Sequence, residues 1–142
     1  MIGGQVMDIV SEGKQVPLEI LEYIHRHKTA ALISVAVTMG GLLGGGTPAQ
    51  VQALEDYGHS VGWAFQIADD LLDVEGDTAT LGKQVGRDAE LEKVTYPALL
   101  GVTASRQRAL ELMEQGIGAL AGLGPGAEPL RQIAEYIVSR DM

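Results

Sequence analysis

The chain has 142 residues, of which 46% are apolar and 20% are charged, a balance typical of one compact globular domain and not of a disordered segment. Its 19 acidic residues outnumber the 10 basic ones, and the resulting net charge of -9 argues against binding to nucleic acid or to an anionic membrane surface. The absence of cysteine excludes disulfides, thiolate metal sites and a cysteine nucleophile.

The first five residues carry neither the basic region nor the apolar run of a signal peptide, so we expect an untargeted, cytoplasmic protein. Helices are then predicted over Leu18 to His25 and Thr29 to Leu43. The second helix has no charged residue after its start, but its strongly apolar part is too short to span a bilayer comfortably. We therefore expect it to be a buried core helix, and we expect no membrane span.

A basic cluster, His25-Arg26-His27-Lys28, stands directly before the helix that is predicted to begin near Thr29. Acidic side chains are the usual choice at the N-terminus of a helix. Basic side chains beside exposed backbone N–H groups instead favour a site for a phosphate or diphosphate group. A solvated, charged turn is the alternative interpretation of this cluster.

A long helix is predicted after Thr47, which suits a helix cap, and Pro48, which suits a first turn. Gly76-Asp77 is expected to end it. Apolar residues recur along one face of this helix at steps of three and four, at Val51, Leu54, Gly58, Val61, Phe65, Ala68 and Leu72.

Further helices are predicted over Tyr96 to Gly101, Ala104 to Leu123 and Glu128 to Arg140. The sequence shows no strand-like alternation, so we expect an all-α fold. Several glycines fall inside helical patterns, where close packing between helices would explain them: Gly40, Gly58, Gly62, Gly116 and Gly118.

The principal chemical signal is Asp69-Asp70-Leu71-Leu72-Asp73, which lies among apolar neighbours near the end of the long helix. Helical spacing puts Asp69 and Asp73 on one stripe with Gln66, and we expect this stripe to face a cavity. Mg²⁺ prefers oxygen ligands and usually takes one or two carboxylates together with phosphate oxygens. A magnesium site is therefore predicted, with a solvated acidic helix end as the alternative.

The polar segment from Glu75 to Thr95 is long enough to suggest a functional loop. It contains Lys83, Arg87 and Lys93, whose default interpretation is exposed basic side chains. Together with the aspartates, these residues suggest binding of a diphosphate. Helices rich in Ala, Gly, Leu and Val could enclose an apolar group, and an isoprenoid diphosphate has both kinds of end.

The sequence resembles the trans-prenyl diphosphate synthases, and most closely the bacterial farnesyl or geranylgeranyl diphosphate synthases. The resemblance extends over nearly the whole chain. Five landmarks occur in the order that is typical of this family: Gly3-Gly4-Gln5 with Asp8, His27-Lys28-Thr29, Phe65-Gln66 leading into Asp69-Asp70-Leu71-Leu72-Asp73, Gly76-Asp77-Thr78 with Leu81-Gly82-Lys83, and Lys93-Val94-Thr95-Tyr96-Pro97.

This resemblance implies a magnesium-dependent prenyltransferase that ionises an allylic diphosphate and joins the carbocation to isopentenyl diphosphate. It implies that Asp69 binds Mg²⁺ directly and that Asp70 and Asp73 complete the metal site. Lys28, Lys83 and Lys93 are implied to contact diphosphate. Thr29 and Gln66 are implied to stabilise the charge that develops in the transition state. The implied catalytic residues are Lys28, Thr29, Gln66 and Lys83.

One feature departs from the family pattern, because no upstream D-D-x-x-D with paired arginines precedes Gly3-Gly4-Gln5 in this sequence. We therefore expect residues 1–142 to form the carboxy-terminal half of the prenyl synthase helical bundle and to be inactive alone. Such a chain is expected to form a homo-oligomer or to complement a separate amino-terminal half. A noncatalytic regulatory or structural subunit and a class I terpene cyclase are the alternative interpretations.

Overall fold

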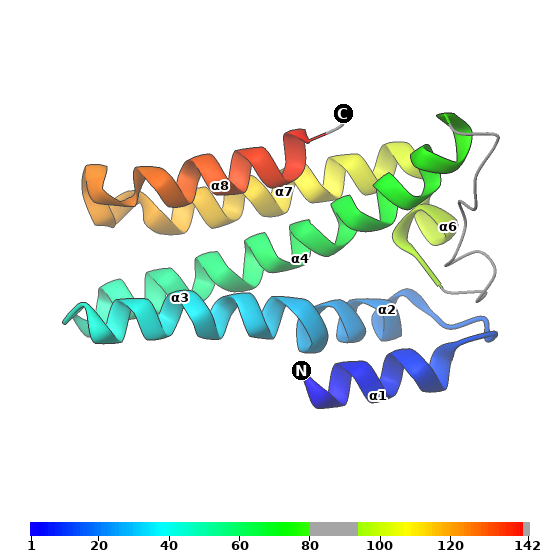
Figure 1. The fold of residues 1–142 in the computed structure, drawn as a ribbon, viewed down its shortest axis with the longest axis horizontal. Helices are drawn as coiled ribbons and strands as arrows, with labels where there is room; N and C mark the ends of the chain where they lie inside the picture. The colour runs from blue at the N-terminus through cyan, green and yellow to red at the C-terminus, as the bar shows by residue number, and fades with distance from the viewer. Residues whose placement is uncertain (80–93, 141–142) are drawn as a thin grey trace.

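The computed structural model describes residues 1–79 and 94–140, and every regular element in these ranges is a helix (Figure 1). The all-α prediction is therefore confirmed for this part of the chain. The elements are α1 (Ile2–Ser11), α2 (Leu18–His25), the π-helical turn η1 (Arg26–Ala30), α3 (Ala31–Leu43), α4 (Pro48–Ala79), α6 (Tyr96–Leu100), α7 (Val102–Ala119), the 3₁₀ segment η2 (Leu120–Ala127) and α8 (Glu128–Ser139).

Helix α4 begins where the sequence predicts. The Gln50 backbone N–H donates to Thr47 Oγ1 at 3.3 Å, and the Thr47 N–H donates to Gln50 Oε1 at 2.9 Å, which forms a reciprocal cap. The predicted end at Gly76-Asp77 is wrong by a few residues, because the helix continues to Ala79. Gly76 is tolerated inside the helix, because a glycine there costs only about 1 kcal/mol relative to alanine.

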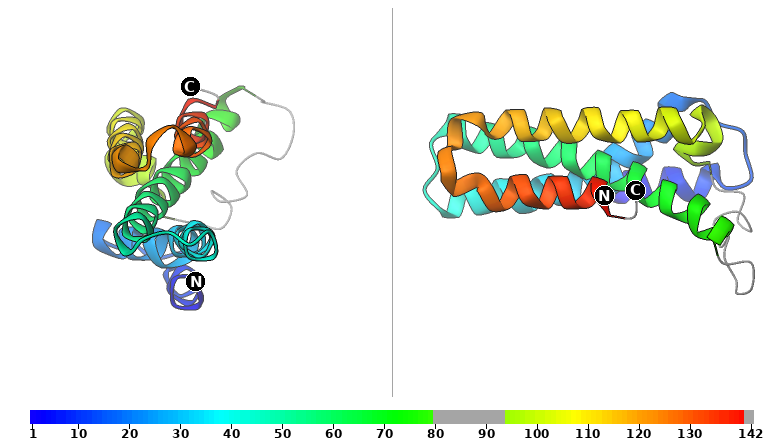
Figure 2. Two further views of the ribbon diagram at one scale, coloured as in Figure 1. Left: turned by 90° about the vertical axis from the view of Figure 1, so that its left-hand side faces the viewer. Right: turned by 90° about the horizontal axis from the view of Figure 1, so that it is seen from above.

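Helix α4 is the central element of the fold, with η1 and α3 packed on one side and α7 and α8 on the other (Figures 1 and 2). A Cβ atom added at Gly58 would collide with the Cα atom of Ser34, and one added at Gly62 would lie 2.6 Å from the Cα atom of Ala30. The prediction of close helix packing is confirmed at these two glycines, and also at Gly116. It is wrong for Gly40 and Gly118, which have open space beside them.

Two clusters of buried side chains hold α4 in place. The cluster around Tyr57 and Val61 joins it to η2 and α8. The other surrounds the part of α4 that leads into the aspartates and includes side chains from α2, α6, α7 and α8: Leu21, Ala30, Trp63, Ala64, Ile67, Leu71, Tyr96, Ala109, Leu112 and Val138. The aspartate end of α4 is thus fixed from several directions.

Helices α2 and α3 form one continuous path through the π turn η1. The Ala31 backbone N–H donates to the carbonyl oxygen of Arg26, five residues earlier, which widens the helix by one residue without breaking it. The prediction of a helix N-terminus near Thr29 is therefore wrong, because the backbone N–H groups there are used inside the helix. A diphosphate site made of free N–H groups is excluded at this point.

Helix α3 is not the buried core helix that its apolar sequence predicts. Ser34 is its buried residue, whereas Leu32, Val35, Met39, Leu42 and Leu43 are each more than half exposed. Helix α1, which was not among the predicted helices, likewise exposes Ile2, Val6, Ile9 and Val10. No described helix combines the length and the apolar character needed to cross a membrane.

Candidate functional site

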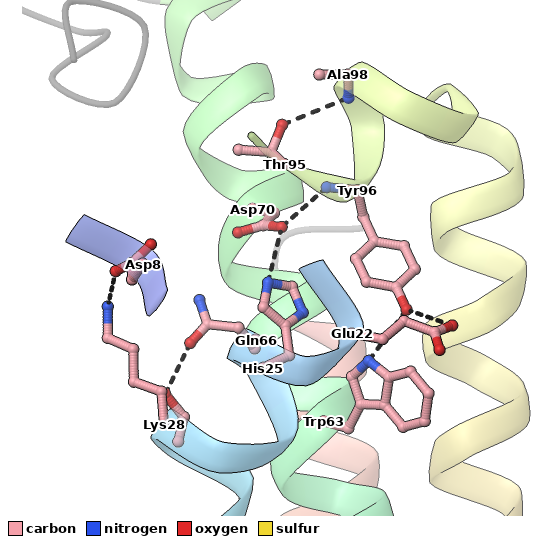
Figure 3. Close-up of polar contacts among 11 residues, drawn as sticks. Asp8, Glu22, His25, Lys28, Trp63, Gln66, Asp70, Thr95, Tyr96 and Ala98 are labelled. Atoms are coloured by element: carbon pink, nitrogen blue, oxygen red, sulfur yellow. Dashed lines mark hydrogen bonds and ion pairs between the residues drawn. The ribbon is translucent and has the colours of Figure 1, made fainter. Parts of the chain in front are cut away.

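The candidate site lies where α1, η1 and α4 meet. Lys28, in the π turn, directs its Nζ atom towards α1 and donates to Asp8 Oδ2 at 2.6 Å (Figure 3). Helix α1 can approach this closely because Gly4 has no side chain, and a Cβ atom there would collide with the backbone of Lys28. Both charged groups are partly buried, with 32% of the Lys28 side chain and 19% of the Asp8 side chain exposed.

The residue after Lys28 faces α4. The Thr29 hydroxyl donates to Gln66 Oε1 at 2.8 Å. Gly62 lies one turn before Gln66 on the same helix and packs directly on Ala30, so the two backbones are close enough for this contact. The sequence predicts Thr29 and Gln66 as site residues, and the fold brings them together.

Asp70 is the buried carboxylate of the aspartate motif, with 7% of the residue exposed. Its Oδ2 atom accepts the backbone N–H of Tyr96 at 3.0 Å. Burial raises the pKa of Asp70 to about 7, and the charges of Asp69 and Asp73 add to the rise, although the neighbouring Tyr96 N–H and Gln66 side chain act in the opposite direction.

His25 lies beside this carboxylate, with its Nε2 atom 3.5 Å from Asp70 Oδ2 (Figure 3). The imidazole is 4% exposed and stacks on the Tyr96 ring, with 5.2 Å between the ring centroids. Burial, with a smaller contribution from the Lys28 charge, lowers the pKa of His25 to about 3. The ring is therefore neutral at physiological pH, and its Nδ1 atom has no hydrogen-bond partner.

These groups line one small pocket of about 40 Å³, which is room for about one water molecule. Its polar lining comes from α1, α2, η1, α4 and the residue before α6. The lining residues are Asp8, Leu21, Ile24, His25, Lys28, Gln66, Asp70, Val94 and Thr95.

Asp69 and Asp73 are exposed, contrary to the expectation that their stripe faces an internal cavity. About half of the Asp69 side chain is exposed, and its Oδ1 atom lies 3.6 Å from Nη2 of Arg140, at the end of α8. Consecutive helical residues are turned by about 100°, so Asp70 points inward while its neighbours point out. No three metal-ligating side chains converge anywhere in the described ranges.

The side chains of the basic cluster around Lys28 also point in different directions, because consecutive helical residues are turned by about 100°. The Arg26 guanidinium lies over the Trp63 ring, 4.2 Å from its centroid, and pairs with Glu22. The His27 ring stacks on Tyr23 and is exposed. Lys28 is thus the one cluster member whose charge reaches the site, while Lys83, Arg87 and Lys93 lie outside the described residues.

Asp8 and Tyr96 contribute to the site, although the sequence pattern predicts no role for either residue. Asp8 was noted as a landmark, and its pairing with Lys28 depends on contact between helices twenty residues apart. Tyr96 contributes a backbone N–H to Asp70, and its hydroxyl links Trp63 to Glu22. A backbone donor leaves no trace in residue type, so the sequence offered no signal for it.

A family model described as polyprenyl synthetase matches residues 1–119 of the chain. The farnesyl diphosphate synthase of Escherichia coli (strain K12) is 48% identical over 145 residues, which cover 99% of this chain and 48% of that protein. Geranylgeranyl pyrophosphate synthase 12, chloroplastic, of Arabidopsis thaliana is 42% identical over 144 residues, which cover 99% of this chain and 40% of that protein.

Among solved structures, the geranyltransferase from Helicobacter pylori complexed with magnesium and isoprenyl diphosphate superposes with a TM-score of 0.73 at 33% identity. The match covers 99% of this chain and 46% of the other. The chain described above thus spans less than half the length of each of these three proteins.

Proposed function

Because this chain belongs to the polyprenyl synthetase family, we propose that it acts in prenyl transfer, the joining of an allylic diphosphate to isopentenyl diphosphate. The observation that carries the proposal is the meeting of Lys28, Thr29 and Gln66 at one junction of η1 and α4. A cation and two neutral dipoles at that junction suit a substrate that separates into a diphosphate anion and a carbocation.

Lys28 is proposed to bind the diphosphate. In the structure its ammonium group is paired with Asp8, so a diphosphate must compete with one carboxylate for it. A diphosphate offers several charged oxygens, and a charge-assisted bond to it is stronger than a neutral hydrogen bond. Lys83 and Lys93 are proposed as further diphosphate contacts on the basis of the family resemblance.

Thr29 and Gln66 are proposed to stabilise the cation that forms when the diphosphate leaves. The Thr29 hydroxyl donates a hydrogen bond to Gln66 Oε1, so the lone pairs of the Thr29 oxygen remain available to face a cation. Fixed oxygen dipoles lower the energy of a developing positive charge without reacting with it. Neither side chain is a strong nucleophile, which protects the carbocation from capture.

The aspartate motif is proposed to hold Mg²⁺, which when bound would neutralise negative charge on the diphosphate and so help it to leave. Asp69 and Asp73 fit this ion, because they offer exposed carboxylate oxygens one helical turn apart, and Mg²⁺ commonly takes one or two protein carboxylates. Asp70 completes the motif, and its inward carboxylate would support the helix end that carries the other two.

Calorimetry that measures the binding of inorganic diphosphate to the chain, with and without Mg²⁺, tests this proposal. The expected result is exothermic binding that Mg²⁺ strengthens and that Lys28→Met abolishes. Lys14→Met, a change of an exposed lysine in the α1–α2 connection, is the matched control and should bind as the unaltered chain does. Binding that is equal in the two variants would refute the role of Lys28.

A further inference from the structure

We infer that a groove between η1, α4 and α7 is a second ligand site, which binds a small organic phosphate, that is, a phosphate monoester on an apolar body. The groove has a volume of about 430 Å³, and small-molecule sites in proteins usually measure about 300–1,000 Å³. We call it the Trp63 groove, after a residue in its floor. The inference does not rest on the proposed function, because it uses none of the residues proposed to take part in prenyl transfer.

The lining of the Trp63 groove gathers basic and polar side chains on an acidic chain. Arg26 and His27 approach from η1, and His59 and Ser60 approach from α4. No described residue with a carboxylate lines the groove, although acidic residues outnumber basic ones by 19 to 10 in the whole chain. The groove therefore suits an anionic group.

The floor of the Trp63 groove is apolar and fixed. Leu112 of α7 is 2% exposed and Trp63 is 6% exposed. The indole Nε1 of Trp63 donates to the Tyr96 hydroxyl at 3.1 Å, which holds the ring in place. Inorganic phosphate would leave this apolar surface in contact with water, whereas an apolar body attached to the phosphate would cover it. The floor thus favours an organic phosphate.

Arg26 is held in a position that suits the binding of an oxyanion. Its guanidinium lies over the Trp63 ring, 4.2 Å from the centroid, and cation–π attraction stabilises this placement. Glu22 Oε2 lies 3.7 Å from Arg26 Nη2, which is too far for a hydrogen bond, and Glu22 Oε1 accepts the Tyr96 hydroxyl. The edge of the Arg26 guanidinium can therefore donate to two oxygens of a phosphate.

His27 restricts which anions suit the groove. Its Nδ1 lies 2.9 Å from the backbone carbonyl oxygen of Tyr23, which can only accept, so Nδ1 carries the hydrogen. The ring also stacks on the Tyr23 ring, with 4.0 Å between the centroids. A neutral His27 ring therefore offers a ligand its Nε2 without a hydrogen, and this lone pair repels an oxygen that also lacks one.

A phosphate monoester matches both groups. Its second pKa is about 6, so near neutral pH it keeps or readily regains one proton. One phosphate oxygen can share this proton with His27 Nε2, while two others accept from Arg26. A carboxylate has lost its proton at neutral pH, and so has a sulfonate, so either would require His27 to take up a proton from solution.

The Trp63 groove and Lys28 lie on different sides of the same π turn. Figure 3 shows Lys28 directed towards α1 and Trp63 on the side of α4 that faces α7, where the Arg108 guanidinium packs on the Trp63 ring. A phosphate in the groove therefore contacts Arg26 without displacing Lys28 from its ion pair with Asp8.

Fluorescence of the whole chain during titration with phenyl phosphate provides the test, because Trp63 is the sole tryptophan and lines the groove. Excitation is set where phenyl phosphate does not absorb. A saturable change in emission is expected. Phenyl phosphate should bind about tenfold more tightly than inorganic phosphate, which lacks the apolar body, and about tenfold more tightly than benzenesulfonate, which lacks the proton. No saturable change, or equal affinity for phenyl phosphate and either comparison ligand, would refute the inference without any variant.

Two substitutions test the assigned contacts. Arg26→Met keeps an unbranched side chain over the indole but loses the N–H groups, and it should weaken phenyl phosphate about tenfold. His27→Phe keeps a ring that can stack on Tyr23 but has no ring nitrogen, and it should abolish the preference for phenyl phosphate over benzenesulfonate. Unchanged affinity in Arg26→Met, or an unchanged preference in His27→Phe, would refute the inference. Loss of packing alone would weaken both ligands equally and leave that preference intact.

Two lysine variants serve as controls. Lys14→Met removes a charge in the α1–α2 connection, and Lys28→Met removes the charge on the other side of the π turn. Both should bind phenyl phosphate as the unaltered chain does, and circular dichroism checks that every variant keeps its helices. Loss of the fluorescence response in Lys28→Met would place the phosphate at Lys28 and overturn the assignment to the Trp63 groove.

Discussion

His25 Nε2 and Asp70 Oδ2 lie 3.5 Å apart in the protein interior, and the pKa values of the two groups are shifted in opposite directions. Burial lowers that of His25 from 6.5 to about 3 and raises that of Asp70 from 3.8 to about 7. At a pH of about 5 the unfolded chain therefore carries one proton on His25, and the folded chain carries one on Asp70. The pair as a whole takes up almost no protons on folding.

This compensation predicts that the pair adds little pH dependence to the free energy of unfolding until one member is removed. In His25→Gln, the folded state holds the Asp70 proton more tightly than the unfolded state, so stability should fall as the pH rises from about 4 to about 7. In Asp70→Asn, the unfolded state binds a proton at His25 that the folded state rejects, so stability should rise as the pH rises from about 3 to 6.5.

Urea unfolding at a series of pH values measures both slopes. The charges near the pair, Lys28 beside His25 and Asp69 and Asp73 beside Asp70, are the same in every variant. The double variant His25→Gln/Asp70→Asn is the control and should lack both slopes. If the free energy of unfolding changed with pH in the same direction in both single variants, the opposite pKa shifts of His25 and Asp70 would be contradicted.

Removal of the carboxylate that competes for Lys28 should strengthen diphosphate binding. In Asp8→Asn, the Lys28 ammonium loses its partner at 2.6 Å, and the repulsion between Asp8 and a diphosphate disappears as well. Because the pair is partly exposed, we expect a gain of only about two- to tenfold in affinity. Calorimetry measures it, with Asp56→Asn as a control at an exposed position far along α4. Weaker binding in Asp8→Asn would show that Asp8 orients Lys28 and does not compete for it.

Close packing at Gly62 should make substitution there costly. A Cβ atom would lie 2.6 Å from the Cα atom of Ala30 and force η1 away from α4, so Gly62→Ala should destabilise the fold by about 1–3 kcal/mol. Gly40→Ala is the matched control inside α3, where nothing lies within 4 Å, and it should gain up to about 1 kcal/mol. Urea unfolding measures the stability of both variants. Equal changes in the free energy of unfolding would contradict the close packing of η1 on α4 at Gly62.

The exposed aspartates should control the effect of Mg²⁺ on diphosphate binding. Asp69→Ala is expected to reduce the strengthening by Mg²⁺, because one of the two exposed carboxylates is lost. Arg140→Gln should increase it, because the Arg140 guanidinium lies 3.6 Å from Asp69 and competes with a metal ion. Calorimetry at several Mg²⁺ concentrations measures both changes. An unaltered Mg²⁺ dependence in Asp69→Ala would show that the metal ligand is misassigned.

The apolar surface of α3 should cause the isolated chain to associate. Leu32, Met39 and Leu43 are more than half exposed on this helix, and large apolar patches commonly mark interfaces. Light scattering should therefore find species above 15.0 kDa, the mass of one chain. Leu32→Gln/Met39→Gln should reduce association more than Ile133→Gln, which changes an exposed residue on α8. A monodisperse monomer that binds no hydrophobic dye would contradict this expectation.

The sequence by itself determined much of the local structure and the family. Apolar steps of three and four located α4, and Thr47 and Pro48 located its start, because a helix cap and a first turn depend on neighbouring residues. The landmarks from Gly3 to Pro97 indicated the polyprenyl synthases, and the family match confirmed that resemblance. These signals are local or depend on their order along the chain, so they could be recognised without coordinates.

Tertiary structure alone decided which neighbouring side chains face the site. Asp69 and Asp70 are chemically identical and adjacent, yet only Asp70 is buried, because a turn of about 100° per residue separates them and α2 and α6 cover one side of α4. The same rotation separates Lys28 from Arg26 and His27. The partners Asp8 and Tyr96 are distant in sequence, and the exposure of α3 depends on what packs against it. Residue type sets what a side chain can do, and helix packing sets what it contacts.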